Sequence, residues 1–177
     1  AGRFRHGIDF WRRIFGTLPH PLVLPSDRPR PAQPSYGGAR LPVHIPHDVV
    51  RGLRRLAAQE RVTLFMLLET AMAALLHRYS GAEDLVIATV VAGRSHSAFE
   101  RVVGPFFNIL ALRHELHGDE PFRALLARSR AAILDAFTHQ DVPFAAVVRA
   151  VSESDSGPLA AQPLFQVMFQ AHTEAEA

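Results

Sequence analysis

The stretch DLVIATVVAG, residues 84–93, decides the fold. It is a continuous apolar run rich in branched side chains, which is typical of a central strand buried on both faces. A second strand, FFNILALRHEL at residues 106–116, is predicted after the turn signal Gly104–Pro105. Helical patterns lie before and after these two runs. Strands interleaved with helices predict an α/β layered fold.

The segments around these two strands show the spacing of helices. Thr63 is a suitable N-cap for a helix at 64–79, which is apolar on nearly every face and is therefore expected to be buried on several sides. A loop is predicted at 152–163, followed by a final strand at 164–170. The other predicted helices span residues 47–60, 120–138 and 143–151.

The first 46 residues show three different patterns. Residues 8–17 carry apolar side chains at helical spacing, which predicts a short amphipathic helix. Six prolines between residues 19 and 34 predict an extended surface linker over 18–37. The segment ARLPVHIP, residues 39–46, alternates apolar and other side chains and predicts a half-buried strand at a sheet edge. The apolar members of this alternation are Leu41, Val43 and Ile45.

Composition narrows the class of protein. The chain has 177 residues, 48% of them hydrophobic, which is enough for one sizeable core. It has no cysteine, which excludes disulfides and fits a cytoplasmic protein. All 19 basic residues are arginine, the net charge is +2 and there is no basic run, so no nucleic-acid surface is expected. The apolar runs are too short to span a membrane.

Common catalytic and metal-binding motifs are missing from the sequence. Two histidine pairs, His44 with His47 and His114 with His117, lie at predicted strand ends and have no third ligand in register, so no metal site is predicted. There is no G-x-S-x-G elbow, no P-loop and no G-x-G-x-x-G motif. Serine-hydrolase and nucleotide chemistry are therefore not expected.

A cluster of polar residues lies in FTHQDVPFAAVV, residues 137–148. His139 and Asp141 stand close enough in sequence to be half of a catalytic apparatus. They also suit the end of one helix and the start of the next, because His favours a helix C-terminus and Asp before Pro143 is a helix start signal. Local physical chemistry favours this structural role.

Four stretches together resemble the C-terminal, acceptor-side half of nonribosomal peptide synthetase condensation domains. The chain also begins without methionine and ends in the polar stretch AHTEAEA, as expected for a piece of a longer protein. On this resemblance, residues 1–37 are an inter-subdomain helix with a proline-rich linker, and residues 38–177 are the C-terminal subdomain. The stretches are TVVAGR (89–94), VVGPFFNILALR (102–113), HQDVPF (139–144) and PLFQVMF (163–169).

The resemblance implies a fold like half of chloramphenicol acetyltransferase, a layered mixed sheet with flanking helices. It implies a tunnel between two such halves, entered from opposite ends by the 4'-phosphopantetheine arms of donor and acceptor carrier proteins. The other expected partners are the N-terminal half of the domain and an adjacent adenylation domain, and no covalently bound cofactor is expected. The family's HHxxxDG motif belongs to the N-terminal half and is missing here, so no catalytic residue is expected in this chain.

The resemblance also assigns site residues. Asn108 matches the family's motif asparagine, whose amide donates to a carbonyl or to the pantetheine arm. Gly104, Phe106 and Arg94 are placed along the tunnel. In the family's RDxSR-like stretch, only Asp155 and Ser156 remain here. The matched HQDVPF motif is expected to shape the acceptor-side wall through His139, Gln140, Asp141, Pro143 and Phe144.

Three functions are open at this point. The first is an enzyme part, the acceptor-side half of an amide-forming domain, which is active only in the intact domain. The second is a related member of the superfamily that forms esters, epimerises or recruits a partner enzyme. The third is a non-catalytic module that binds carrier proteins. The isolated chain is expected to associate or to be poorly soluble, because a half-domain exposes apolar surface.

Overall fold

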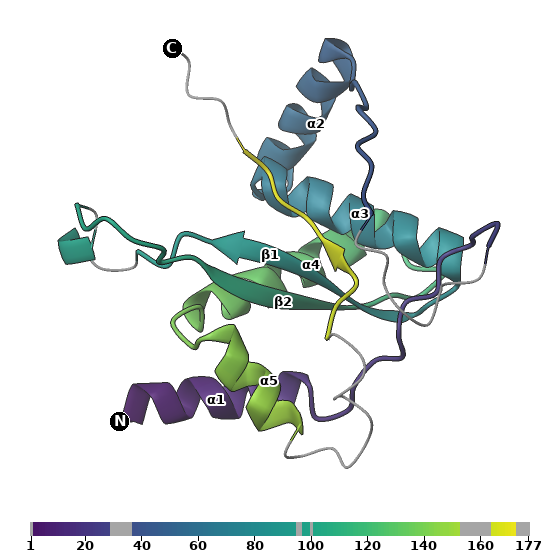
Figure 1. The fold of residues 1–177 in the computed structure, drawn as a ribbon. Coiled ribbons are helices and arrows are strands. Elements are labelled where there is room, and N and C mark those ends of the chain that lie inside the picture. The colour runs from purple at the N-terminus through teal and green to yellow at the C-terminus, as the bar shows by residue number, and fades with distance from the viewer. Residues whose placement is uncertain (1, 29–36, 95–96, 100, 153–163, 173–177) are drawn as a thin grey trace.

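The computed structural model describes residues 2–28, 37–94, 97–99, 101–152 and 164–172. These residues form helices on both sides of a small sheet (Figure 1). None of the helices among them is long and apolar enough to cross a membrane. The elements in chain order are α1 (Gly2–Ile14), α2 (His47–Gln59), α3 (Leu64–Ser80), β1 (Asp84–Val91), η1 (Ser97–Phe99), β2 (Asn108–Glu115), α4 (Phe122–Thr138), α5 (Phe144–Ser152) and β3 (Val167–Met168).

The sheet has the order β2-β1-β3, so β1 is the central strand, as the sequence predicts. β1 runs antiparallel to β2 from the pair Asp84–Glu115 to the pair Val91–Asn108. It runs parallel to β3, with Ala88 opposite Met168. The sheet is therefore mixed, and the predicted fold class is confirmed.

Helices cover both faces of the sheet. The side chain of Arg113 reaches the C-terminal end of α1, where it donates to the carbonyl of Ile14. Its neighbour His114 points to the other face and contacts Glu69 of α3 and Ser129 of α4. Because successive residues of a strand point to opposite faces, α1 lies on one face and α3 with α4 on the other. α5 packs beside α1 (Figure 1).

The N-terminal helix is part of the main core. Trp11 of α1 and Phe15, which follows the helix directly, are buried, and they pack in one cluster with residues of both long strands and of α4 and α5. α1 begins at Gly2, six residues before the predicted start at residue 8. Gly7 is buried within it, and a Cβ at this position would lie 2.5 Å from Val142 Cγ2. The glycine therefore allows the close approach of α1 to the segment before α5.

The predicted burial of α3 is confirmed. Thr63 caps this helix, since its hydroxyl accepts a hydrogen bond of 3.1 Å from the Met66 N–H. Met66, Leu67 and Ala73 are buried within the helix. α2 packs its apolar side against α3, with Leu53, Leu56 and Ala57 in the cluster around Leu67 and Leu126.

The predicted strand at residues 39–46 is wrong, because this segment forms neither helix nor strand. Leu41, Val43 and Ile45 are exposed, with 87% of Leu41 accessible to solvent. A strand needs a hydrogen-bonding neighbour, and no described segment pairs with this one. The predicted strands at 106–116 and 164–170 are shortened to Asn108–Glu115 and Val167–Met168. In the predicted linker, residues 29–36 lie outside the described part of the chain.

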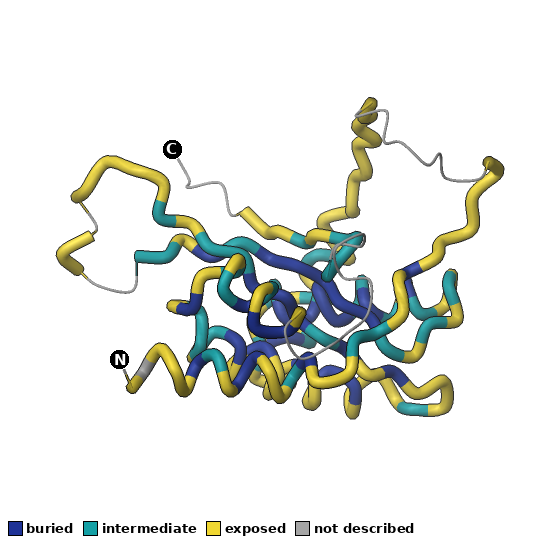
Figure 2. Tube along the Cα trace, turned by 60° about the horizontal axis from the view of Figure 1, so that its bottom comes forward, coloured by how far each residue is buried: buried dark blue, intermediate teal, exposed yellow. Residues whose placement is uncertain are grey.

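Residues 92–94, 97–99 and 101–107, between β1 and β2, form an arm that projects from the body (Figure 1). The tube coloured by burial shows most of the described arm as exposed (Figure 2). Val103 is 99% accessible and Phe107 is 65% accessible. The arm therefore presents apolar side chains to the outside.

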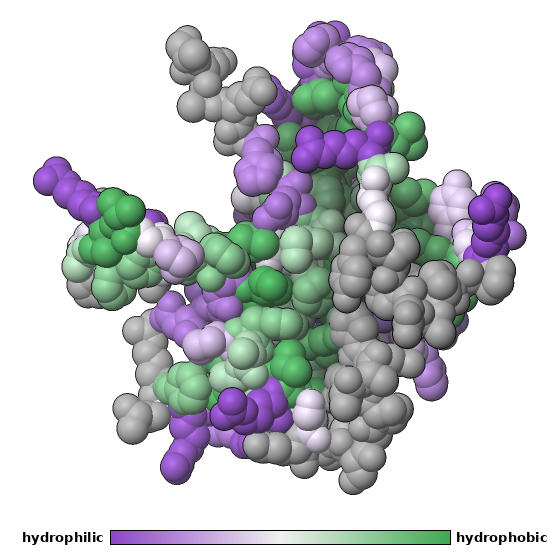
Figure 3. Space-filling model, in the orientation of Figure 1, coloured by the Kyte–Doolittle hydropathy of each residue, from purple (hydrophilic) through white to green (hydrophobic). Residues whose placement is uncertain are grey.

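We expect the isolated 177-residue chain to associate in solution. Apolar side chains lie across the middle of one face and on the arm (Figure 3), and Leu41, Val43 and Val103 are more than three-quarters exposed. Sedimentation velocity should show species larger than a monomer. Leu41→Ser with Val43→Ser should reduce association, whereas Arg40→Ser, beside them, should not. A monodisperse monomer at micromolar concentration would contradict this expectation.

Candidate functional site

The arm is organised around the guanidinium group of Arg94. This group donates hydrogen bonds to the carbonyl of Phe99, to that of Val102 at 3.0 Å and to that of Gly104 at 3.3 Å. It also lies over the ring of Phe106, 4.5 Å from the centroid. A planar group with several donors suits this combination of carbonyl and aromatic contacts. Three of the predicted tunnel residues, Arg94, Gly104 and Phe106, therefore meet in one place.

Gly93 permits the arm to fold back on itself. Its φ is +63°, a left-handed backbone conformation that residues other than glycine rarely adopt. A Cβ here would lie 1.7 Å from the backbone oxygen of Phe106. The two ends of the arm thus cross at a point where only hydrogen fits.

We expect Arg94→Ala to loosen the arm without unfolding the domain. Losing the carbonyl hydrogen bonds should make residues 101–107 exchange their amide hydrogens about tenfold faster, which corresponds to about 1.4 kcal/mol. Hydrogen–deuterium exchange with mass spectrometry measures this. Arg94→Lys should recover only part of the protection, because an ammonium group lacks the planar fork. Arg101→Ala removes a neighbouring exposed cation and should have no effect. Equal exchange in Arg94→Ala and the parent would contradict the anchoring role.

Asn108, the first residue of β2, joins two of the sequence motifs. Its Nδ2 donates to the carbonyls of Gln140 and Val142, each at 2.8 Å. Its Oδ1 accepts from the N–H of Phe144 at 3.0 Å. The amide thus fixes the shape of the segment between α4 and α5. Its role as a direct donor to a ligand stays a prediction, since the described hydrogen bonds of its side chain all go to backbone.

His139 occupies a different environment from Asn108. It ends α4, and its Nδ1 lies 2.8 Å from the carbonyl of Asp135. Its ring stacks on Phe10 of α1, with centroids 3.9 Å apart and an angle of 4° between the planes. The carbonyl of His139 accepts from Trp11 Nε1 at 3.4 Å. His139 therefore joins α4 to α1.

The remaining motif residues complete this segment. Asp141 and Pro143 are exposed, and Phe144 is half-buried against Phe165, with ring centroids 5.6 Å apart. The sequence-predicted residues thus form two groups, one around Arg94 and one around Asn108, and β2 begins between them. Asp155 and Ser156 lie outside the described residues.

Sequence reasoning missed a buried polar chain behind the sheet. His114 Nε2 lies 2.7 Å from Oε1 of Glu69, and His114 Nδ1 lies 3.4 Å from the hydroxyl of Ser129. All three residues are at most 3% exposed. Oε2 of Glu69 is buried without a hydrogen-bond partner among the described residues. A carboxylate in the mostly apolar stretch of residues 64–76 is the signal of these contacts in the sequence.

An ion pair ties the two long strands together at their outer end. Nε and Nη2 of Arg113 donate to the carboxylate of Asp84 at 2.9 and 2.7 Å. This hydrogen bonding raises the pKa of Arg113 above its usual value. Within the described residues, no group of three or more histidine, aspartate or glutamate side chains is arranged to hold a metal ion.

The amino-acid sequence of this chain is similar to that of known proteins. The family model described as "Condensation domain" matches residues 3–175. Tyrocidine synthase 3 of Brevibacillus parabrevis is 42% identical over 170 residues, which cover 96% of this chain and 3% of that protein. The chain therefore spans only a small part of this curated relative.

The fold of this chain also matches solved structures. The chain matches a four-domain nonribosomal peptide synthetase bound to AMP and glycine with a TM-score of 0.84 and 31% identity, over 92% of this chain and 12% of that chain. It matches the X-domain from teicoplanin biosynthesis with a TM-score of 0.83 and 30% identity, over 93% of this chain and 36% of that chain.

Proposed function

Since the chain belongs to the condensation-domain family, we propose that it is the C-terminal half of a domain that forms an amide bond between two carrier-tethered groups. The observation that carries this proposal is the junction at Asn108. There one side chain holds the GPFFN and HQDVPF motifs together at the start of β2. This junction and the arm around Arg94 would supply part of the wall along which the tethered substrates lie.

The proposed reaction needs little covalent chemistry from this half. The amine nitrogen of the acceptor attacks the thioester carbonyl carbon of the donor, the C–N bond forms, and the C–S bond breaks to release the donor thiol. The proton lost by the amine ends on that thiol. Holding two tethered reactants in line contributes much of the acceleration. Under this proposal, the N-terminal half supplies the histidine of HHxxxDG, and residues of this chain position the arms.

The proposal includes its partners and its place in the cell. Donor and acceptor carrier proteins would bring 4'-phosphopantetheine arms to the tunnel, and an adenylation domain would lie next to the condensation domain. Residues 1–37 would pass between the two halves, and residues 38–177 would form the second. The whole assembly would work in the cytoplasm. A synthetase with four domains among the structural matches supports a multidomain setting.

The decisive experiment uses the intact domain that contains this chain. Purified domain is mixed with a donor and an acceptor carrier protein, each loaded with an aminoacyl group, and the acceptor is analysed by mass spectrometry. We expect a dipeptidyl thioester on the acceptor. Alanine in place of the second histidine of HHxxxDG in the N-terminal half should abolish it. The 177-residue chain alone should give none.

Recruitment of a partner enzyme is the second candidate, and one observation favours it. The match to the X-domain is nearly as good as the match to the synthetase, and a further match is a complex of that X-domain with OxyB. The same assay separates the two functions. Another enzyme that binds the intact domain while no product forms would favour recruitment, and a dipeptidyl product would favour amide formation.

A further inference from the structure

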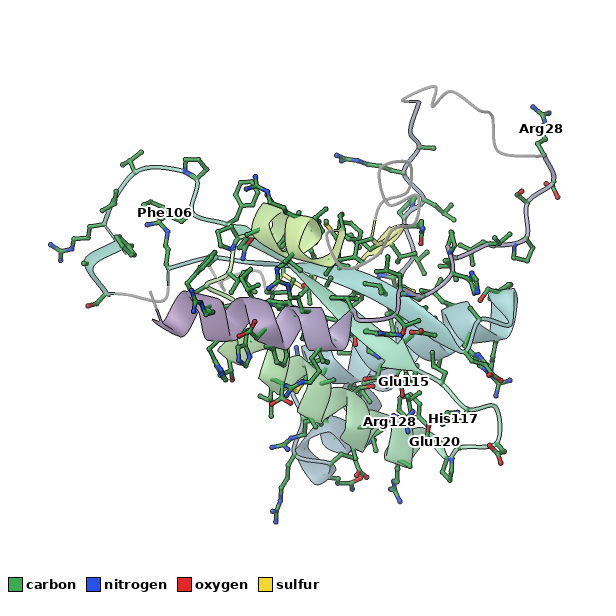
Figure 4. The ribbon with its side chains drawn as sticks, turned by 90° about the horizontal axis from the view of Figure 1, so that it is seen from below. Arg28, Phe106, Glu115, His117, Glu120 and Arg128 are labelled. Atoms are coloured by element: carbon green, nitrogen blue, oxygen red, sulfur yellow. The ribbon has the colours of Figure 1, made fainter. Side chains whose placement is uncertain are left out.

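A hollow of about 420 Å³ lies at the outer edge of β2, away from the Asn108 junction. The side chains around it come from α1 and α4, which stand on opposite faces of the sheet. Its floor is the strand itself, from Ala111 to Glu115. Figure 4 shows Phe106 on the arm at one end of β2, and Glu115 with Arg128 at the opposite end. The hollow therefore occupies the position of an additional strand.

The backbone of β2 points hydrogen-bonding groups into this hollow. The N–H of Leu116 donates to the carbonyl of Glu83, just before β1. The backbone N–H and C=O of Leu116 therefore point toward β1. In an antiparallel pair the residues alternate in direction, so Ala111 and Arg113 turn their N–H and C=O groups to the outer edge. No described strand pairs with this edge. Ala111 is only 2% exposed, whereas Arg113 is half-buried, so the outward groups that a ligand can reach are those of Arg113.

Both ends of the hollow are closed by side chains. At one end, the ring of Phe10 stacks on His139, and Trp11 donates to the His139 carbonyl. At the other end, Arg128 donates to the carbonyl of Glu115 at 2.5 Å. The open stretch of edge between them is the length of only a few residues. It is too short for a long strand and has the right length for one or two peptide units.

The lining favours an uncharged ligand. Arg113 is paired with Asp84, and Arg128 is paired with Glu120. Arg13 and Asp135 at the rim carry opposite charges. Two buried polar side chains adjoin the hollow, His114 and Ser129, and the contact between them is long at 3.4 Å. Apolar surface comes from Trp11 and from alanine residues of α4.

We propose that this edge hollow binds a short, uncharged peptide unit in an extended conformation, of the class of N-acylated amino-acid amides. The N–H and C=O of Arg113 pair with the C=O and N–H of the ligand, as in strand addition to a sheet edge. A small apolar side chain of the ligand contacts Trp11 or Ala132. The site is separate from the Asn108 junction, and its occupancy does not depend on amide formation by the domain.

The test uses N-acetyl-L-alanine N-methylamide and the intact domain that contains this chain, with ¹³C-labelled alanine methyl groups. Four alanines line the hollow, and Ala57 and Ala73 lie far from it and serve as internal references. NMR titration should show saturable shifts at the hollow and none at the references. The ligand is small, so we expect a Kd on the order of millimolar. The four reporters are Ala111, Ala131, Ala132 and Ala136.

Two controls separate edge pairing from unspecific contact. Ala132→Leu should fill part of the hollow and weaken binding at least about tenfold, whereas Ala124→Leu, an exposed position on the same helix, should not change it. The analogue methylated on both amide nitrogens has no N–H donor and should not bind to the parent domain, a result that does not depend on how any variant folds. Absence of saturable shifts in the parent, or equal binding of the methylated analogue, would overturn the proposal.

Discussion

Replacing His114 with alanine is expected to lower the free energy of unfolding by about 3–5 kcal/mol. The substitution leaves the carboxyl group of Glu69 without the imidazole that lies 2.7 Å away. The side chain of Glu69 is completely buried. Its second oxygen already has no partner among the described residues, so no nearby group replaces the lost hydrogen bond. Urea unfolding of the intact domain, followed by circular dichroism, measures the loss.

The paired replacement gives the sharper test. Glu69→Leu together with His114→Leu removes both polar groups and should stay within about 1 kcal/mol of the parent, because apolar side chains avoid the cost of burying polar groups. His117→Ala changes an exposed histidine nearby and should alter stability by less than about 0.5 kcal/mol. If the double variant loses as much stability as Glu69→Leu and His114→Leu, measured separately, lose together, the two side chains are not coupled.

Asn108→Ala is expected to have the largest effect on activity of any single change in this chain. It removes three hydrogen bonds to the segment before α5 and should cost about 2–4 kcal/mol of stability. Because that segment would then shift against β2, we expect kcat/KM for amide formation to fall on the order of a hundredfold. The carrier-protein assay with the intact domain measures this loss.

A matched control lies at the opposite end of the same strand. Glu115→Gln keeps the backbone contact with Arg128 and should leave both stability and kcat/KM near the parent values. A positioning role also predicts that Asn108→Ala lowers kcat more than it raises KM, because the misplaced wall affects alignment of the reactants. Lost stability with unchanged kcat/KM would mean that the junction is purely structural.

The sequence predicts the centre of this fold well because the signals there are local. The apolar run of residues 84–91 is long enough to mark a strand buried on both faces. Thr63 marks the start of α3 because capping depends only on the next three residues. The failure at residues 39–46 has the opposite cause. Alternation identifies which side chains share a face, but a strand forms only where another segment supplies hydrogen bonds.

The site is only partly predictable for a similar reason. The motif match identifies Asn108 and the HQDVPF segment but does not show that the amide bonds to backbone at three places. The Glu69–His114–Ser129 chain joins residues 45 and 15 positions apart, and its members become neighbours only when α3 and α4 pack on the same face of the sheet. The close approach at Gly7 depends on packing in the same way.

The parallel pairing of β3 with β1 has a consequence for synthesis on the ribosome. β3 has two residues, and the hydrogen bond from the Phe169 N–H to the Ala88 carbonyl joins segments that are far apart in the chain. Closing so long a loop is entropically costly and gives few contacts in return. β1 and β2 can pair as soon as both have left the exit tunnel, whereas β3 must wait until α4 and α5 have also emerged. During that interval the inner edge of β1 is open, so this edge is where nascent chains would need protection by a chaperone.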